Sequence, residues 1–147
     1  MTKQIKTAIQ INANKETVWN VLMDFEKYSE WNPFIKSITG AVEIGNKLHV
    51  KFHGMSFKPK VVTLNKNSEF KWLGHLLFKG LFDGEHRFFL IENTDGTTTF
   101  EQSEVFNGLL LPLFSKSLDT DTKSSFHKMN EQLKIRAEIM CEMAAID

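Results

Sequence analysis

Apolar and polar residues alternate along much of the chain up to residue 106, and a period of two predicts β-strands. The first strand is expected at 3–11, with the odd-numbered residues from Ile5 to Ile11 on one face. Six further strands are expected at about 37–44, 47–53, 57–64, 69–78, 85–92 and 97–106. These seven segments predict an antiparallel meander.

The turns of this meander are of two kinds that alternate along the chain. The polar turns lie at 45–46, 65–68 and 93–96, and the longer or more apolar ones at 54–56, 79–84 and 107–113. Successive turns of a meander fall at opposite ends of the sheet, so all apolar turns are expected at one end. A loop that only reverses the chain has no need of Leu81, Phe82 or Leu110. The apolar turns at this end of the sheet are therefore expected to border an apolar space.

Helices are expected at both ends of the chain. Residues 12–14 supply capping side chains, and Val18, Trp19, Leu22 and Phe25 follow at helical spacing. A second short helix is expected at 26–29, and the helical stretch ends before Pro33. Trp31 and Phe34 either pack these helices on the sheet edge or line a cavity.

The last third of the chain predicts one long helix from about 115 to 143. Its apolar stripe steps by three and four residues and consists of Leu118, Thr122, Phe126, Met129, Leu133, Ala137, Met140 and Ala144. Weak helix formers at 119–125 predict a ragged or mobile beginning. Ile135, Ile139 and Ile146 lie opposite the stripe and either pack on the first helices or form a weak self-association surface.

The order of elements predicts an α+β fold. A curved, seven-stranded antiparallel sheet is expected to wrap round the long C-terminal helix, with two short helices between the first two strands. If the sheet curves more than the helix can fill, a void remains between them. Its mouth would lie at the end with the apolar turns.

Composition narrows the functional class. The chain has 147 residues, which suits one domain, and its 18 basic and 18 acidic residues leave no basic footprint for nucleic acid. Thirteen Phe against one Tyr suit a core or a lined cavity. Cys141 is the only cysteine and is expected to be a packed thiol, and no signal peptide or membrane span is visible. A cytoplasmic location is therefore expected.

Three polar residues stand out because they lie on otherwise apolar faces that are expected to point inward. They are His86, Gln102 and Glu104. An unpaired buried polar group costs about 1–3 kcal/mol, so each needs a partner or a water molecule. The three form either a cluster that faces a ligand, in which His86 and Glu104 exchange protons as base and acid, or a hydrogen-bonded group satisfied within the sheet.

The face assignment of the last strand is ambiguous. Its even-numbered residues from Phe100 to Phe106 are the more apolar set, so we expect them to point inward. A simple four-residue turn at 93–96 would instead pair residue 86 with residue 103 and turn the odd-numbered residues inward. A β-bulge or a different turn length would remove this conflict.

Other kinds of site have little support. His49 and His53 share a strand face, but two solvated outer-face histidines explain this spacing better than a metal pair does. The sequence contains no HExxH pair, no phosphate-binding glycine loop and no Gly-x-Ser-x-Gly turn. No metal and no cofactor are expected.

Several segments resemble one known superfamily. They are Val18-Trp19, Trp31-Asn32-Pro33-Phe34, GLFDGEHRF at 80–88, EVFNGLL at 104–110 and FHKMNEQLK at 126–134. Together with the order of elements, they resemble the SRPBCC superfamily, which is the START-like or helix-grip group, and in particular its polyketide cyclase/dehydratase-like bacterial branch. The resemblance spans nearly the whole chain and implies a helix-grip fold. It does not select a function, because members bind lipids, hormones, polyketides and other apolar ligands, and only some are enzymes.

The resemblance and the apolar turns imply a single domain, residues 1–147, that binds a hydrophobic or amphipathic small molecule such as a lipid, an isoprenoid or a polyketide-like molecule. The expected site is a cavity between the sheet and the C-terminal helix, gated by the loops 79–84 and 107–113. The expected ligand-binding residues are Trp31, Phe34, Phe52, Phe57, Trp72, Leu81, Phe82, His86, Phe88, Phe100, Gln102, Glu104, Leu110, Phe126, Met129 and Leu133.

Two alternatives remain. The chain could be a cyclase/dehydratase-type enzyme acting on a polyketide-like substrate, with His86 and Glu104 as the candidate catalytic residues. It could also be a co-chaperone-like interaction module that uses its apolar loops as a contact patch. The sequence favours binding over catalysis, and we expect a monomer or weak dimer that binds no nucleic acid and does not insert stably into membranes.

Overall fold

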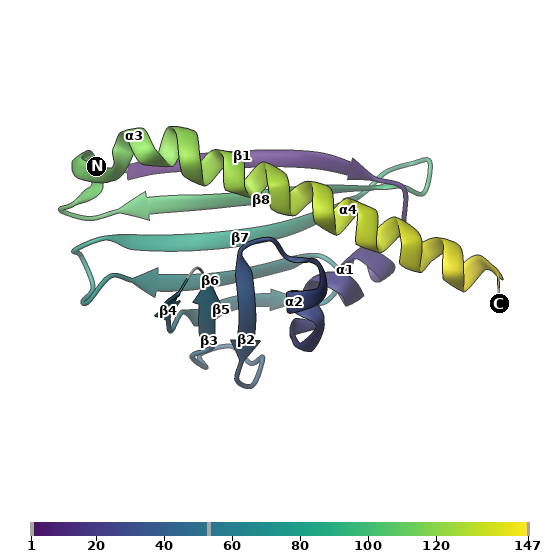
Figure 1. Ribbon diagram of the computed structural model, residues 1–147, viewed down its shortest axis with the longest axis horizontal. Helices are drawn as coiled ribbons and strands as arrows, with labels where there is room; N and C mark the ends of the chain where they lie inside the picture. The colour runs from purple at the N-terminus through teal and green to yellow at the C-terminus, as the bar shows by residue number, and fades with distance from the viewer. Residues whose placement is uncertain (1, 53, 147) are drawn as a thin grey trace.

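The computed structural model describes residues 2–52 and 54–146. The first part of the chain contains β1 (Thr2–Ile11), α1 (Lys15–Met23), a 3₁₀ turn (Phe25–Lys27), α2 (Tyr28–Trp31), β2 (Ile35–Thr39), β3 (His49–Phe52), β4 (Met55–Phe57) and β5 (Lys60–Asn65). The second part contains β6 (Glu69–His75), β7 (Asp83–Glu92), β8 (Thr98–Asn107), α3 (Leu111–Ser117), a π-helical segment (Leu118–Thr122) and α4 (Lys123–Ile146). In Figure 1, α3 and α4 lie across β1 and β8, and the last turns of α4 extend beyond the sheet.

The strands form two antiparallel sheets, so the expectation of one seven-stranded sheet was wrong. Within the described residues, a five-stranded sheet has the order β1-β8-β7-β6-β5 and a three-stranded sheet the order β2-β3-β4. A bridge between Lys47 and Lys60 links them, and the smaller sheet runs across the strands of the larger one (Figure 1). The α+β arrangement of a curved antiparallel sheet that grips a long C-terminal helix is confirmed.

A proline explains the extra strand. The stretch 57–64, which was expected to be one strand, is divided between β4 and β5. Pro59 lies between them, and proline has no N–H to donate to a sheet ladder. Its carbonyl oxygen accepts a hydrogen bond from the Leu48 amide at 2.9 Å, at the point where the chain passes from one sheet to the other.

The two helices expected after β1 are present. Asn14 caps α1, because its Oδ1 accepts a hydrogen bond from the Thr17 amide at 2.8 Å. The second helical stretch is the 3₁₀ turn followed by α2, and it ends at Trp31, two residues before a proline.

The C-terminal helix begins earlier than expected and contains an irregular section. α3 starts at Leu111, and Pro112 stands in its first turn, where the missing N–H costs no helical hydrogen bond. The π-helical segment then joins α3 to α4. This segment falls among the weak helix formers from which the sequence predicted an irregular beginning.

The buried stripe of α4 agrees with the prediction in its middle and not at its end. Phe126, Met129, Leu133 and Ala137 are buried, whereas Met140 is 44% exposed. On the opposite face, Ile135 and Ile139 remain 52% and 49% exposed, so they do not pack on the first helices.

Buried apolar side chains form two separate cores. The larger core lies between the sheets, α1 and α4, and includes Trp19, Phe70, Phe88, Phe100 and Leu133. The smaller core lies under α3 and consists of Ile5, Phe106, Leu111, Leu118 and Phe126, with Phe82 and Phe114 packed against it.

Two apolar loops lie side by side at one end of the larger sheet, as the sequence predicted. They are the β6–β7 loop and the β8–α3 loop, at the left of Figure 1. Backbone hydrogen bonds join them, from Leu109 N to Gly80 O at 3.0 Å and from Leu110 N to Leu81 O at 2.9 Å. Gly108 allows this approach, because a Cβ there would lie 2.5 Å from the Leu81 carbonyl oxygen.

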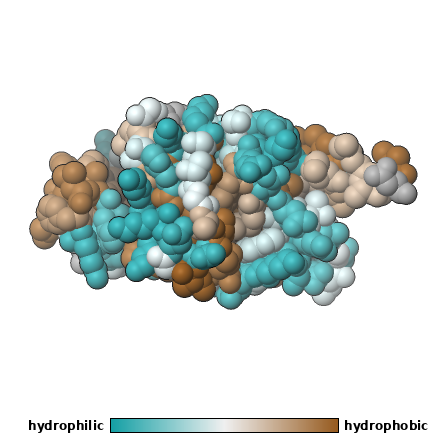
Figure 2. Space-filling view, turned by 90° about the horizontal axis from the view of Figure 1, so that it is seen from below, coloured by the Kyte–Doolittle hydropathy of each residue, from teal (hydrophilic) through white to brown (hydrophobic). Residues whose placement is uncertain are grey.

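These loops and the first turn of α3 present exposed apolar side chains, which we call the apolar tip. Its members, between 60% and 86% exposed, are Leu77, Phe78, Leu109 and Leu113. Figure 2 shows hydrophobic surface at this end of the molecule. Leu77 has a left-handed backbone conformation, with φ of 63°. The third apolar turn, at 54–56, instead joins β3 to β4 in the smaller sheet.

Candidate functional site

The register of β7 and β8 decides which residues face the C-terminal helix. His86 pairs with Glu104, and Phe100 and Gln102 are at most 1% exposed. The even-numbered residues of β8 therefore point inward, as expected. The loop between the strands spans 93–97, one residue more than a four-residue turn, and this length removes the conflict in register.

Seven of the expected ligand-binding residues, from both sheets and α4, form one connected cluster of rings. They are Phe52, Phe57, Trp72, His86, Phe88, Phe100 and Phe126. Neighbouring ring centroids lie between 4.8 and 6.0 Å apart. His86 is central, because its ring contacts Trp72, Phe88 and Phe126.

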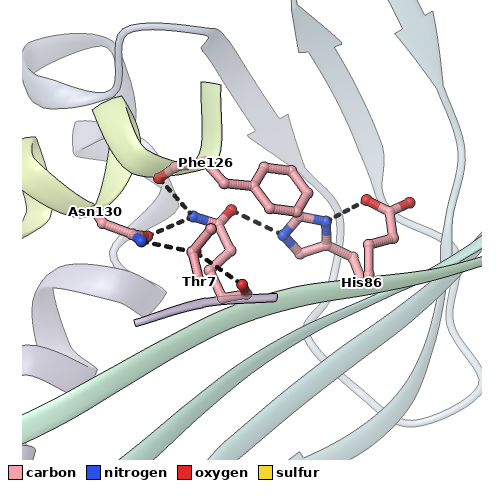
Figure 3. Close-up of polar contacts among 6 residues, drawn as sticks. Thr7, His86, Phe126 and Asn130 are labelled. Carbon is pink, nitrogen blue, oxygen red and sulfur yellow. Dashed lines mark hydrogen bonds and ion pairs between the residues drawn. The ribbon is translucent and has the colours of Figure 1, made fainter. Parts of the chain in front are cut away.

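Five polar side chains form a hydrogen-bonded layer across the interior, which we call the polar layer (Figure 3). It consists of Thr7 from β1, His86 from β7, Gln102 and Glu104 from β8, and Asn130 from α4. His86 Nδ1 lies 2.7 Å from Glu104 Oε1, and its Nε2 lies 3.0 Å from Gln102 Oε1. Gln102 Nε2 donates to Asn130 Oδ1 at 2.7 Å and to the Phe126 carbonyl oxygen at 3.3 Å. Asn130 Nδ2 donates to Thr7 Oγ1 at 2.8 Å, and the Thr7 hydroxyl donates to the Gln102 carbonyl oxygen at 2.9 Å.

The polar layer separates the two cores. Along β8, Phe100 belongs to the larger core and Phe106 to the smaller, and the layer residues Gln102 and Glu104 lie between them. Thr7 occupies the equivalent position along β1. The layer therefore lies between two apolar clusters of different size.

The donors and acceptors in the polar layer can be assigned from the main-chain carbonyl oxygens that take part in it. The main-chain carbonyl oxygens of Phe126 and Gln102 can only accept, so the Gln102 side chain must turn its Nε2 toward Phe126 and its Oε1 toward His86. The reversed amide would place two oxygens 3.3 Å apart. His86 Nε2 consequently carries a proton, which it donates to Gln102 Oε1.

One further proton lies between His86 and Glu104. A bare nitrogen and a carboxylate oxygen would repel each other at the observed 2.7 Å, so a proton must lie between them. It belongs either to an imidazolium that faces a carboxylate or to a carboxylic acid that faces a neutral imidazole. In both forms the pair as a whole is electrically neutral. Such a shared proton is what general acid–base chemistry requires.

Two glycines face one another beside this pair. Gly74 of β6 pairs with Gly84 of β7, which leaves the sheet without side chains at that point. A Cβ on Gly84 would lie 2.1 Å from Glu104 Oε2, whereas a Cβ on Gly74 would lie 3.6 Å from the Phe57 ring. The Glu104 carboxylate thus occupies room that Gly84 leaves. Sequence reasoning missed this role, although Gly84 stands two residues before His86 on the same strand face.

Thr7 and Asn130 were also missed as site residues. Each interrupts an apolar stripe, because Thr7 alternates with Ile5 and Ile9, and Asn130 follows Met129 on the buried side of α4. Both are buried, and a buried polar side chain needs a partner. A polar residue on each of these apolar faces was the signal in the sequence that could have identified them.

Leu81, Phe82 and Leu110 lie in the two joined loops, where the gate was expected. The Phe82 ring centroid lies 5.6 Å from that of Phe106 and 4.9 Å from that of Phe114. Phe82 therefore packs against aromatic rings of β8 and α3 in this structure.

The other expected residues lie away from the polar layer. Met129 and Leu133 are buried in the larger core. Trp31 lines a hollow of about 250 Å³ between α1 and α4, and a second hollow of about 530 Å³ also lies beside α1. Phe34 follows α2, and its amide donates to Asn32 Oδ1 at 2.9 Å.

An ion pair closes the base of the β6–β7 loop. His75 Nδ1 lies 2.8 Å from Asp83 Oδ1, and the Gly80 amide donates to both carboxylate oxygens at 3.0 Å. Partial burial alone would raise the pKa of Asp83. The hydrogen bonds from His75 and Gly80, with the charges of His75 and Lys79, outweigh that effect, so the pKa of Asp83 lies below its usual value.

Few other groups suggest chemistry. The part of the chain that the structure describes holds no cluster of three or more His, Cys, Asp or Glu side chains that could bind a metal ion. His49 is half-buried in β3, and His53 lies outside the described residues. Cys141 packs against the larger core.

No described helix combines the length and apolar character needed to cross a membrane.

Comparison with solved structures supports the fold. A hypothetical protein from Helicobacter pylori aligns with a TM-score of 0.79 and 11% identity over 92% of this chain and 88% of its own. The Zhui aromatase/cyclase from Streptomyces sp. R1128 aligns with a TM-score of 0.73 and 13% identity over 94% of each chain. A START superfamily protein from Mycobacterium smegmatis aligns with a TM-score of 0.64 and 19% identity over 96% of this chain and 98% of its own. At identities this low, the alignments show that the fold is shared and do not show a shared function.

Comparison of sequences identifies the family. No curated protein matches the chain. The family model described as polyketide cyclase / dehydrase and lipid transport matches residues 2–138. Since this match covers nearly the whole chain, the chain belongs to the polyketide cyclase/dehydrase and lipid transport family.

Proposed function

We propose that this chain is a single domain that binds a hydrophobic or amphipathic small molecule, such as a lipid, an isoprenoid or a polyketide-like molecule, between the larger sheet and the C-terminal helix. The observation that carries the proposal is the position of the His86–Glu104 pair. It faces the interior among aromatic rings, yet 11% and 18% of the two side chains remain exposed. A hydrogen bond that served only to stabilise a core would be enclosed, as Gln102 and Asn130 are at 1% exposure.

The ligand would enter through the gate at the two apolar loops. Phe82 and Phe114 pack against Phe106 of the smaller core, and an apolar ligand can replace these contacts with its own. Burying about 300 Å² of ligand surface yields about 7 kcal/mol before association costs. This gain exceeds the roughly 0.5–1.5 kcal/mol that each aromatic pair contributes beyond burial.

Native mass spectrometry of protein purified without detergent from its own organism tests this proposal. We expect a species with the added mass of a small molecule, which is lost on unfolding and recovered in an organic extract. Gly84→Leu forces the Glu104 carboxylate out of the room beside Gly84 and into the proposed ligand site, and it should remove the added mass. Ile44→Ser, which changes an exposed apolar residue away from the site, should retain it. An unmodified mass in every preparation and an unchanged amide NMR spectrum on adding amphiphiles would contradict the proposal.

A second candidate function is cyclase- or dehydratase-type catalysis on a polyketide-like substrate. The shared proton of His86 and Glu104 favours it, because such a pair can both remove and return a proton. The family description also includes cyclases. A turnover assay with a poly-β-ketone substrate would support catalysis if His86→Ala and Glu104→Gln each abolished activity and left binding of the product intact.

A third candidate is a protein-interaction module that uses the apolar tip. The exposure of Leu77 and Leu109, 86% and 81%, favours it. In that case Leu77→Ser and Leu109→Ser would abolish binding of the partner protein, while the interior would hold no ligand.

A further inference from the structure

We propose that the site selects an uncharged amphiphile whose polar end is a hydroxyl group, and that Glu104 Oε2 accepts the hydrogen bond from that hydroxyl. The proposal deepens the proposed function and rests on it. It concerns which chemical class is bound, and it follows from the hydrogen-bond inventory of the polar layer.

The first step is that the polar layer has one accessible end. Gln102 and Asn130 are 1% exposed, and Thr7 is 4% exposed, so these three are enclosed. The side chains of His86 and Glu104 keep 11% and 18% of their surface. A ligand on the inward face of the sheet would therefore meet this pair and not the rest of the layer.

The second step is that Glu104 Oε2 is the polar side-chain atom of this pair that makes no hydrogen bond to a described residue. Both nitrogens of His86 are engaged, Nε2 with Gln102 and Nδ1 with Glu104. Glu104 Oε1 is shared with His86, while its Oε2 accepts no hydrogen bond from any described residue. Oε2 lies in the room that Gly84 leaves, with the edge of the Phe106 ring beside it.

The third step is that Oε2 is an acceptor in either form of the pair. If Glu104 is a carboxylate, Oε2 is one of its two acceptor oxygens. If the shared proton stays on Oε1, Oε2 is the carbonyl oxygen of the acid. The ligand must therefore donate, as an alcohol or a phenol does and as a ketone does not.

The fourth step concerns charge. The neutral His86–Glu104 pair offers no free cation to balance a carboxylate or a phosphate. On the same face of β1, Lys3 is already bonded to Asp119 of the π-helical segment at 2.8 Å. On the other face of the sheet, Lys71 faces Glu85 at 3.5 Å. An anionic head group would lose its hydration beside the Glu104 oxygens without a compensating partner.

Three probes of equal chain length test the proposal: 1-decanol, 2-decanone and decanoate. Their affinities are compared at neutral pH by displacement of a fluorescent apolar dye. We expect decanol to bind about tenfold more tightly than either of the others, since one hydrogen bond to a charged or partly charged acceptor has about that effect. Equal or tighter binding of decanoate or decanone overturns the inference and leaves the proposed function standing. Failure of all three probes to bind overturns both.

Variants assign the preference to Glu104. Glu104→Gln should reduce the preference for decanol over decanoate to near unity, because the carboxylate that repels the anion is gone. Glu85→Gln is the matched control, because it removes a carboxylate from the opposite face of β7 and should keep the full preference. Gly84→Ala, which displaces the Glu104 carboxylate without changing its charge, should also lower decanol affinity about tenfold. The proposal is overturned if Glu104→Gln keeps the preference for decanol over decanoate and Gly84→Ala keeps the decanol affinity.

Discussion

Among single residues, His86 has the most constrained chemistry in the molecule. Gln102 Oε1 on one side can only accept, because main-chain carbonyl oxygens orient the Gln102 amide. Glu104 on the other side can hold or release a proton. The Nδ1 side of the ring therefore faces the one partner that can itself carry a proton.

From the direction of the network, we expect His86 to carry a proton on Nε2. Long-range ¹⁵N–¹H correlation spectra of histidine side chains distinguish a protonated from a bare Nε2. Gln102→Leu removes the acceptor and should speed solvent exchange of this proton. His127, which is exposed on α4, provides a reference signal in the same spectrum. A bare Nε2 in the wild-type protein would contradict the assigned direction of the network.

The facing glycines Gly74 and Gly84 offer a matched comparison of stability. In a strand, replacing glycine by alanine without strain stabilises a protein by about 0.4–1 kcal/mol. Gly74→Ala meets its nearest neighbour at 3.6 Å, so we expect it to be neutral or stabilising. Gly84→Ala would collide with Glu104 at 2.1 Å and should destabilise by about 1–3 kcal/mol, because it disturbs the bond to His86. Urea unfolding measures both. Equal effects would show that Glu104 does not need the room beside Gly84.

At the scale of elements, periodicity predicted the strands and the long helix well, because burial of one face imposes its period on the sequence. It failed where one residue changes the backbone hydrogen bonding. Pro59 divides a strand that alternation alone would continue. No apolar pattern distinguishes the π-helical segment from an α-helix. The weak helix formers therefore predicted where the helix would be irregular, but not that it would be π-helical.

The candidate site was predictable in part. His86, Gln102 and Glu104 were recognised because each is polar on an inward face. Their partners Thr7 and Asn130 lie 123 residues apart in the chain and meet only because β1 and α4 pack together. Alternation shows which face a residue occupies, but not which residue of another element lies opposite. Contacts between side chains of different elements therefore could not be predicted from the sequence.

The β6–β7 loop should depend on pH through Asp83. Since the pKa of Asp83 is lowered below the ordinary 3.8, its bonds stabilise the loop above that value and are lost as the pH falls through the lower folded value. An NMR pH titration should show the Gly80 amide signal moving only below about pH 4. Asp83→Asn is the control and should abolish this movement. A Gly80 transition centred above the ordinary Asp value would contradict the assignment.

At the scale of the whole molecule, the polar layer divides the interior into two parts of different size. The smaller part is closed by α3, the π-helical segment and two loops, and α3 and the segment are joined to α4 through irregular backbone. Irregular helix and few buried contacts favour local opening. Motion of this end does not require the larger core to separate.

Native-state hydrogen exchange should report this division. We expect amides of α3 to exchange faster than those in the middle of α4, because opening of the small core exposes only the former. Added decanol should slow exchange in α3 and leave the centre of α4 unchanged. Uniform protection along the C-terminal helix would mean that the two cores open together.

The conformation of Leu77 has a consequence for the stability of the protein. A leucine at a φ of 63° costs roughly 1–2 kcal/mol compared with glycine, and with 86% of its surface in water it gains little by packing. Leu77→Gly should therefore raise the free energy of unfolding by about that amount. If a partner protein binds the apolar tip, the same variant should also weaken that binding.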